Sequence, residues 1–199
     1  MQLLLNRTSP YARVARVVAL EKGYADELTL VWSDPWNEDA TLLQHNPVRR
    51  VPVLVTDDGH SIAESLLIAS YLDHAGSGAS LLPAAQYAQV LHLTGLAQGL
   101  IDAAFTTMIM RKYHGAEIDD SVLGQRRLQA IARTLPVLDA AYATPATSEL
   151  TLADIVTAVA LDYIAFRLPE IAWQEQYPAL TALRTRMMQR PSFSLTVFS

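Results

Sequence analysis

The 199-residue sequence predicts two domains: an α/β domain over residues 1–77 and an all-helical domain over residues 84–199. Three observations carry this prediction. A strand–helix–strand pattern fills the first 32 residues, and a hairpin pattern follows around residue 58. Beyond a segment rich in glycine and serine at 76–80, almost nothing resembles a strand. A chain of this length fits one long domain or two short ones.

The first pattern is a β–α–β unit. The run QLLLN at 2–6 is typical of a buried strand. Ser9 and Pro10 fit the cap and the first position of a helix, because serine accepts a hydrogen bond there and proline needs no donor. Apolar residues then recur at helical spacing until Gly23, a typical helix end. LTLVW at 28–32 is the second strand, and a helical crossover predicts that the two strands are parallel.

The second pattern is a hairpin followed by a helix. VPVLV at 51–55 predicts a third strand, although Pro52 has no N–H for a strand ladder. An edge position and a cis Val51–Pro52 bond are both compatible with it. Asp58-Gly59 is a turn signal, so residues 60–63 are expected to return antiparallel. A helix is expected to begin at Ser65.

The remaining chain is expected to be helical apart from its loops. Thr151 and Asp154 have the spacing of a capping box at a helix start, which explains Asp154 without any catalytic role. Pro136 implies a kink or a break in the helix that contains it. A loop is expected at 144–149. The helical segments lie near 38–45, 84–112, 119–142, 151–168 and 177–189.

Composition excludes several classes of function. The net charge of −5, without runs of basic residues, argues against a nucleic-acid partner. The chain has no cysteine, which excludes a protein thiol nucleophile, disulfides and cysteine-based zinc sites. Its five histidines lack metal-ligand spacing, so no metal is expected. No apolar run predicts a signal peptide or a membrane span, and a soluble cytoplasmic protein is expected.

The order βαβ–ββα is that of the thioredoxin-like fold. Together with SPYA at 9–12, NPVRRVPVL at 46–54 and the pair Glu64-Ser65, the chain resembles the glutathione transferase family. It is most similar to bacterial, serine-bearing members of theta- or omega-like type. The resemblance implies glutathione as co-substrate, transfer of alkyl or aryl groups, a role in detoxification, and a homodimer.

Within that resemblance, Ser9 is the catalytic candidate. It stands where related thioredoxin-like enzymes carry the first cysteine of CxxC, and here it would donate a hydrogen bond to the glutathione thiolate. A thiol of pKa about 8.5 is only roughly 3% ionised at pH 7. A hydrogen bond to a charged group contributes about 1.5–3 kcal/mol, which lowers a pKa by about one to two units. By itself, the Ser-Pro pair is better explained as a plain helix cap, and only the rest of the pattern favours the catalytic role.

Five further residues are expected to bind glutathione. The backbone of Val51, presented by Pro52, would pair with the cysteinyl part as an added strand does. Arg50, in place of the family's usual lysine, would hold the glycyl carboxylate, while Arg49 replaces the usual glycine. Ser65 would bind the γ-glutamyl carboxylate and Glu64 its ammonium.

The helical domain offers weaker candidates. Asp102 lies on an otherwise apolar helix, where it either reaches the glutathione of a neighbouring subunit or is simply exposed. A small hydrophobic electrophile is expected beside Ser9, although methionine and aromatic stripes are more often core. The lining candidates are Tyr11, Phe105, Met108, Met110, Arg111 and Tyr113, and the Arg111-Lys112 pair suggests anionic substrates.

Two other functions remain open at this point. One is a regulatory or partner-binding protein that keeps the fold without catalysis, although the retained Ser9, Glu64 and Ser65 argue against it. The other is a glutathione-dependent isomerase or dehalogenase, which differs only in its electrophile pocket. Thiol-transferase chemistry is disfavoured, because omega-like enzymes that perform it generally carry cysteine where this chain has Ser9.

Overall fold

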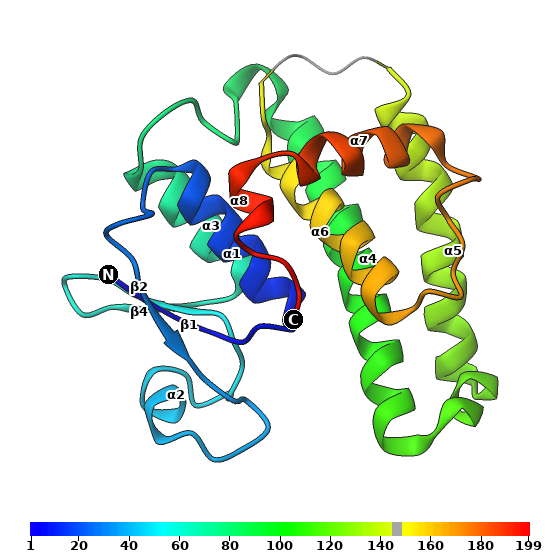
Figure 1. Ribbon diagram of the computed structural model, residues 1–199, viewed down its shortest axis with the longest axis horizontal. Helices are drawn as coiled ribbons and strands as arrows, with labels where there is room; N and C mark the ends of the chain where they lie inside the picture. Colours follow the sequence, from blue (N-terminus) through cyan, green and yellow to red (C-terminus); the bar gives the residue numbers. More distant parts are fainter. Residues whose placement is uncertain (145–148) are drawn as a thin grey trace. The chain divides into compact units, whose positions relative to one another are not determined.

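The computed structural model describes residues 1–144 and 149–199, which form two compact units (Figure 1). The first unit comprises Met1–Leu81 together with Arg190–Ser199, and the second comprises Leu82–Gln189. The sequence placed the division at nearly the same point, but it assigned the C-terminal segment to the helical domain. The loop predicted at 144–149 falls largely outside the described residues.

The first unit contains a four-stranded mixed sheet in the order β2–β1–β3–β4. β1 is parallel to β2 and antiparallel to β3, and β4 is antiparallel to β3. This topology is thioredoxin-like, so the predicted fold of the first domain is confirmed. The elements of the unit are β1 (Gln2–Leu5), α1 (Pro10–Glu21), β2 (Thr29–Trp32), α2 (Ala40–His45), β3 (Val53–Val55), β4 (Ser61–Ala63), α3 (Ser65–Ala75) and α8 (Pro191–Ser194).

Both faces of this sheet are covered. Leu4 and Val53 pack on one face with Leu42 of the short helix α2. Leu3 and Leu54 are also buried and point to the opposite face, because side chains alternate along a strand. Helices α1 and α3 pack against each other over that second face (Figure 1). Burial on both faces explains why the two central strands, β1 and β3, are continuous apolar runs apart from Gln2.

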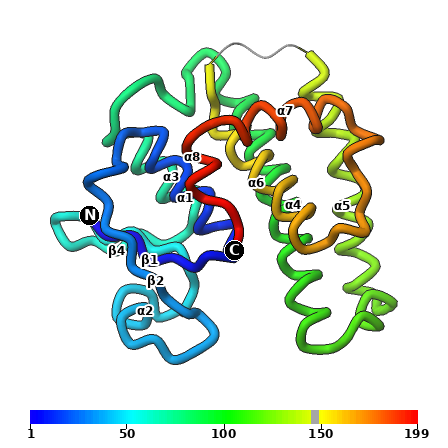
Figure 2. The backbone as a smooth tube through the Cα atoms, in the orientation of Figure 1, coloured from blue at the N-terminus to red at the C-terminus, as the bar shows by residue number. Residues whose placement is uncertain are grey.

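The C-terminal segment packs on α1 within the first unit (Figure 2). Glu21 at the end of α1 accepts hydrogen bonds from Arg190 at 2.8 and 2.7 Å and from the Ser192 hydroxyl. Helix α8 has four residues, too few to give a periodic signal in the sequence. That is why the sequence did not predict α8 or its association with the first unit.

The second unit is all-helical, as predicted. Helix α6 is buried on every side from Leu152 to Ile164 and packs against α4 and α7. The Thr151–Asp154 capping box is present, with the Asp154 N–H donating to Thr151 Oγ1 at 3.3 Å. The elements are η1 (Ala84–Gln86), α4 (Tyr87–His114), η2 (Ala116–Asp120), α5 (Val122–Tyr142), α6 (Leu152–Arg167) and α7 (Pro178–Met188).

Two helices of this unit depart from simple sequence expectations. Helix α5 is not broken at Pro136. Proline has no N–H, so the Ala132 carbonyl, four residues earlier, receives no helical hydrogen bond from Pro136. Both residues are exposed, so water can donate to that carbonyl instead. The segment Ala84–His114 is long and apolar enough, by length and composition, to cross a membrane. It packs against α5 and α6, and a core helix needs the same apolar character.

Candidate functional site

The strand register brings three separate segments to one edge of the sheet. Leu4 pairs with Val53, and Val53 pairs with Ala63. Continuing each strand by two residues places the end of β1, the residues before β3 and the start of α3 side by side. The candidates Ser9, Val51, Glu64 and Ser65 all lie on these three segments. We call this region the sheet edge.

Ser9 caps α1, as predicted. Its hydroxyl oxygen accepts a hydrogen bond from the Ala12 N–H at 3.2 Å, and Pro10 occupies the first turn. A hydroxyl has one hydrogen to donate in addition to its acceptor positions. Accepting from Ala12 therefore leaves the Ser9 hydrogen available for a ligand atom. The positive end of the α1 dipole favours an anion at this position.

The Val51–Pro52 peptide bond is cis, one of the two arrangements compatible with the sequence. Both residues are buried and both precede β3, which begins at Val53. Within the described part of the chain, neither the N–H nor the C=O of Val51 forms a backbone hydrogen bond. A donor and an acceptor on the same residue, both without backbone partners, form a pairing site for an extended peptide.

The loop before Val51 is organised by Asn46, a role that the sequence did not reveal. The Asn46 side chain donates to the Arg50 carbonyl at 2.9 Å and accepts from the Val48 N–H at 3.1 Å. Arg49 has a φ of 58°, the left-handed region that glycine adopts most readily. Its Nε donates to the Pro35 carbonyl at 3.1 Å. The loop therefore has arginine in a conformation suited to the glycine of the family pattern.

Ser65 and Glu64 open helix α3. Glu64 occupies the cap position with a φ of 70°, uncommon for a residue other than glycine, asparagine or aspartate. Such strained backbone is often retained where a functional group must point in a fixed direction. The Glu64 carboxylate is exposed, and in the described residues neither it nor the Ser65 hydroxyl has a hydrogen-bond or ion-pair partner. The Glu64 carboxylate, a hydrogen-bond acceptor, and the Ser65 hydroxyl, a donor, therefore lie next to each other at the N-terminus of α3.

Arg50 and Asp102 are both exposed. The backbone carbonyl of Arg50 is held by Asn46, which leaves its guanidinium at the surface of the first unit. Asp102 lies on α4 and accepts a hydrogen bond from Gln98 at 3.3 Å. Its exposure is compatible with both roles considered for it, so its contact with a neighbouring subunit stays a prediction.

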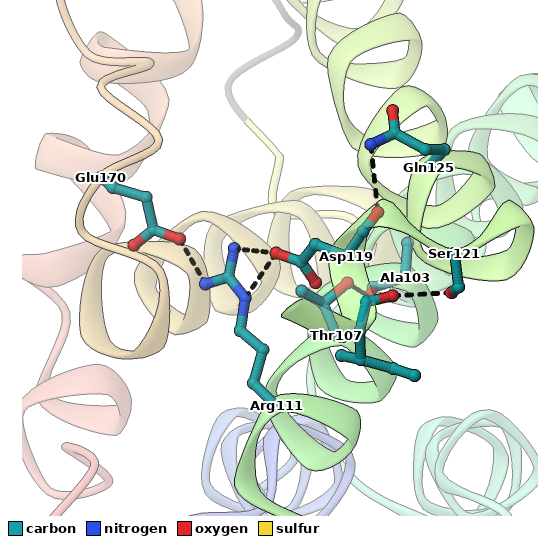
Figure 3. Close-up of polar contacts among 8 residues, drawn as sticks. Ala103, Thr107, Arg111, Asp119, Ser121, Gln125 and Glu170 are labelled. Atoms are coloured by element: carbon teal, nitrogen blue, oxygen red, sulfur yellow. Dashed lines mark hydrogen bonds and ion pairs between the residues drawn. The ribbon is translucent and has the colours of Figure 1, made fainter. Parts of the chain in front are cut away.

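Arg111, a candidate for the electrophile pocket, has two acidic partners (Figure 3). Its Nε and Nη2 lie 2.8 and 2.7 Å from Asp119 Oδ2, and its Nη1 bonds to Glu170. The hydrogen bonds to Asp119 and then to Glu170 raise the pKa of the Arg111 guanidinium, against the opposing effect of burial. Because both carboxylates already neutralise it, Arg111 is poorly suited to attract an anionic substrate.

The other pocket candidates differ in exposure. Tyr11, Phe105 and Met108 are half-buried, whereas Tyr113 is exposed. Phe105 packs against Tyr163 of α6, with ring centroids 6.5 Å apart. Their assignment to an electrophile pocket stays a prediction. Among the described residues, no group of three or more histidine, aspartate or glutamate side chains could hold a metal ion.

Comparison with known proteins gives matches along the whole chain. The family model "Glutathione S-transferase, N-terminal domain" matches residues 8–75, and "Glutathione S-transferase, C-terminal domain" matches residues 96–191. The uncharacterized GST-like protein YibF of Escherichia coli K12 is 32% identical over 201 residues, covering 98% of each chain. The N-terminal match contains Ser9, Arg50, Val51, Glu64 and Ser65.

Two solved structures resemble the chain over nearly its full length. A glutathione S-transferase from Methylobacillus flagellatus KT, with glutathione bound, has a TM-score of 0.90 and 32% identity, covering 100% of this chain and 99% of that one. A glutathione transferase family member from Pseudomonas fluorescens Pf-5, with bound S-(propanoic acid)-glutathione, has a TM-score of 0.85 and 30% identity, covering 98% and 97%.

The N-terminal and C-terminal domains are those of the glutathione-transferase class of thioredoxin-like proteins. The chain belongs to the glutathione S-transferase family. The resemblance noted in its sequence is therefore confirmed at the level of family and fold.

Proposed function

We propose that the protein is a glutathione transferase that activates the thiol of glutathione for attack on a small electrophile. One observation carries this proposal. In the described part of the chain, Val51 lies at one edge of the sheet without backbone partners and Glu64 and Ser65 lie there without side-chain partners, while Ser9 has a hydrogen to donate. Their order matches the charges and peptide groups of glutathione.

Each end of glutathione has a chemical counterpart. The Val51 N–H and C=O pair with the cysteinyl backbone, as two adjacent strands do. The Ser65 hydroxyl and the N-terminus of α3 bind the γ-glutamyl carboxylate, while Glu64 binds the ammonium on the same carbon. Arg50 holds the glycyl carboxylate, and a guanidinium forms two parallel hydrogen bonds with such a group.

This binding mode places the sulfur beside Ser9. The Ser9 O–H donates to the thiolate, and the α1 N-terminus adds favourable electrostatics. The thiol proton leaves to solvent, and the sulfur lone pair forms a bond to carbon while the leaving group departs with its electron pair. Ser9 forms no covalent bond to substrate, and it acts by stabilising charge on sulfur.

The electrophile and the assembly are further parts of the proposal. The relative from Pseudomonas fluorescens binds a glutathione whose sulfur carries a propanoic acid group. This supports a small alkyl or aryl electrophile for the present chain, with Tyr11, Phe105 and Met108 as candidate lining residues. We also propose a homodimer, in which the exposed Asp102 reaches the glutathione ammonium of the other subunit.

The test is the ultraviolet absorbance of the thiolate in the complex with glutathione, measured as a function of pH. Ser9→Ala is expected to raise the pKa of bound glutathione by about one to two units, because one hydrogen bond to the anion is lost. Affinity should change little, and turnover at pH 7 with a model electrophile should fall. Ser70→Ala, which removes an exposed hydroxyl of α3, is the control. An unchanged thiolate absorbance in Ser9→Ala would remove Ser9 from the mechanism.

A further inference from the structure

Arg7 and Arg16 lie around one tryptophan of the first unit. Arg7 follows β1, Arg16 lies on α1 and Trp32 ends β2. The guanidinium carbon of Arg7 is 4.1 Å from the centroid of the Trp32 ring, and that of Arg16 is 5.8 Å from it. Both distances fall within the range of cation–π contact. One indole ring therefore orients two cations.

These groups surround a pocket in the first unit. Its polar lining comes from arginine, amide and hydroxyl groups, most of which are hydrogen-bond donors. Its apolar lining is aliphatic apart from Trp32, which is 44% exposed. The lining residues are Leu5, Asn6, Arg7, Ala12, Arg13, Arg16, Trp32, Thr196 and Val197, and no carboxylate is among them.

Neither Arg7 nor Arg16 has an anionic partner among residues 1–144 and 149–199. Within the described part of the chain, neither side chain forms an ion pair or a hydrogen bond. Burial, and then the nearby Arg7 charge, lower the pKa of Arg16. Two like charges at the mouth of a partly buried pocket are an unfavourable arrangement, and an anion between them relieves it.

The third arginine of the pocket has a different role. Arg13 is buried, and its Nε lies 3.4 Å from Thr196 Oγ1. Its guanidinium also lies over the rings of Phe193 and Phe198, at 5.4 and 4.4 Å. Arg13 therefore fixes the C-terminal segment on α1, and this brings Thr196 and Val197 to the wall of the pocket.

We propose that this pocket binds a small oxyanion, such as a carboxylate or a phosphate, between the guanidinium groups of Arg7 and Arg16. The Asn6 amide, which also donates to the Ser33 carbonyl at 3.4 Å, adds polar lining. The pocket adjoins Ser9, whose N–H donates to the Asn6 carbonyl and whose hydroxyl accepts from the Ala12 N–H, but none of the groups assigned to glutathione is among its lining residues. The proposal therefore does not depend on transferase activity.

Calorimetric titration with inorganic phosphate and with benzoate tests this site. Every titration is performed with the protein saturated with S-methylglutathione, so that the proposed glutathione site is occupied. The variants are Arg7→Gln and Arg16→Gln. Arg126→Gln removes an equal charge from an exposed position of α5 and is the control. Saturation by phosphate alone points to inorganic or phosphorylated ligands, and saturation by benzoate points to organic acids.

The expected result is saturable binding of at least one probe. Loss of a charged hydrogen bond should weaken it about tenfold or more in Arg7→Gln and in Arg16→Gln, with Arg126→Gln unchanged. Arg7 is exposed, so Arg7→Gln tests the site even if the partly buried Arg16 contributes to folding. The proposal is overturned if neither probe saturates, or if both pocket variants bind as tightly as the wild type.

Discussion

The polar side chains at the sheet edge of the first unit and those of the helical unit differ in whether they have hydrogen-bond partners within the protein. At the sheet edge, Glu64 and Ser65 present side chains without protein partners in the described residues. In the helical unit, Arg111 lies between Asp119 and Glu170, and Asp162 accepts two bonds from Arg184 at 3.1 and 2.5 Å. The side chains of Glu64 and Ser65 can therefore bind a ligand, whereas the ion pairs of Arg111 and Arg184 hold segments of the helical unit together.

This difference predicts that some residues affect ligand binding and others affect the free energy of unfolding. Groups that bond to each other stabilise the fold and are costly to break. The exposed Glu64 carboxylate contributes little to folding, because it is hydrated in both the folded and the unfolded chain. The Ser65 hydroxyl has no partner in the described residues, so its removal breaks no hydrogen bond within the described part of the protein. Substitutions of Glu64 and Ser65 should therefore change ligand binding at nearly constant stability, whereas Ser9→Ala also removes the cap of α1. Substitutions in the helical unit should lower stability without changing ligand binding.

The largest expected effect on stability comes from Arg184→Met. This change removes both bonds to Asp162, whose carboxylate is nearly buried on α6, and breaking such a pair lowers the unfolding free energy by about 3 kcal/mol. Glutathione affinity should not change. Urea unfolding measures the first quantity and calorimetry the second. Arg186→Met is the matched control on the same helix, since Arg186 is more exposed and lies 3.9 Å from Asp154.

The converse substitution is Ser65→Ala. It should weaken glutathione binding about tenfold, because a hydrogen bond to a carboxylate is lost. The unfolding free energy should stay within about 1 kcal/mol of the wild type, because the buried Ser65 hydroxyl has no hydrogen bond to lose in the described residues. Unchanged affinity would show that the γ-glutamyl assignment is wrong.

The first unit also contains a carboxylate, Asp73, whose hydrogen bonds are all made within the protein. Its contribution to stability should depend on pH. Burial raises the pKa of Asp73, but hydrogen bonds from the Leu81 N–H, Ser80 and Lys22 outweigh it, so the pKa is lowered overall. A carboxyl with a lowered folded pKa stabilises above its unfolded pKa, which is about 3.9, and loses that contribution as pH falls through the folded value.

Unfolding free energy should therefore fall as pH drops below about 4, and less so in Asp73→Asn. Thermal unfolding at pH 3 and at pH 7 provides the comparison. The same pH dependence in the wild type and in Asp73→Asn would exclude this carboxyl as the source.

The smallest effect is expected from Arg49→Gly. Glycine adopts a φ of 58° without steric cost, but it loses the Nε bond to Pro35 and gains entropy in the unfolded chain. These effects oppose each other, so the unfolding free energy should change by less than about 0.5 kcal/mol. A loss above about 1 kcal/mol would show that the Arg49 side chain supports the loop.

The sequence predicted the elements whose signals are local. The Ser9 cap, the Asp58-Gly59 hairpin turn and the Thr151 capping box each depend on residues within a few positions of one another. The first two place strands and a helix start that form the sheet edge, and the third places the start of α6 in the helical unit. The assignment of these segments to glutathione came from the family resemblance and stays a prediction.

The features that the sequence did not reveal depend on distant contacts or on backbone conformation. Arg190 bonds to Glu21 across most of the chain length, so nothing local indicated that the C-terminal segment belongs to the first unit. The positive φ of Glu64 could not be inferred, because glutamate rarely adopts it. Arg111 had the charge expected of a substrate-binding residue, and only its partners Asp119 and Glu170 revealed its structural role.

Calorimetric titration with glutathione and with S-methylglutathione tests most directly whether the sheet edge is the ligand site. We predict that both bind at micromolar to millimolar strength, that Ser65→Ala weakens both, and that Arg184→Met weakens neither. The absence of detectable binding of either compound by the folded wild-type protein would contradict the assignment. A non-catalytic, partner-binding role for the fold would then be favoured.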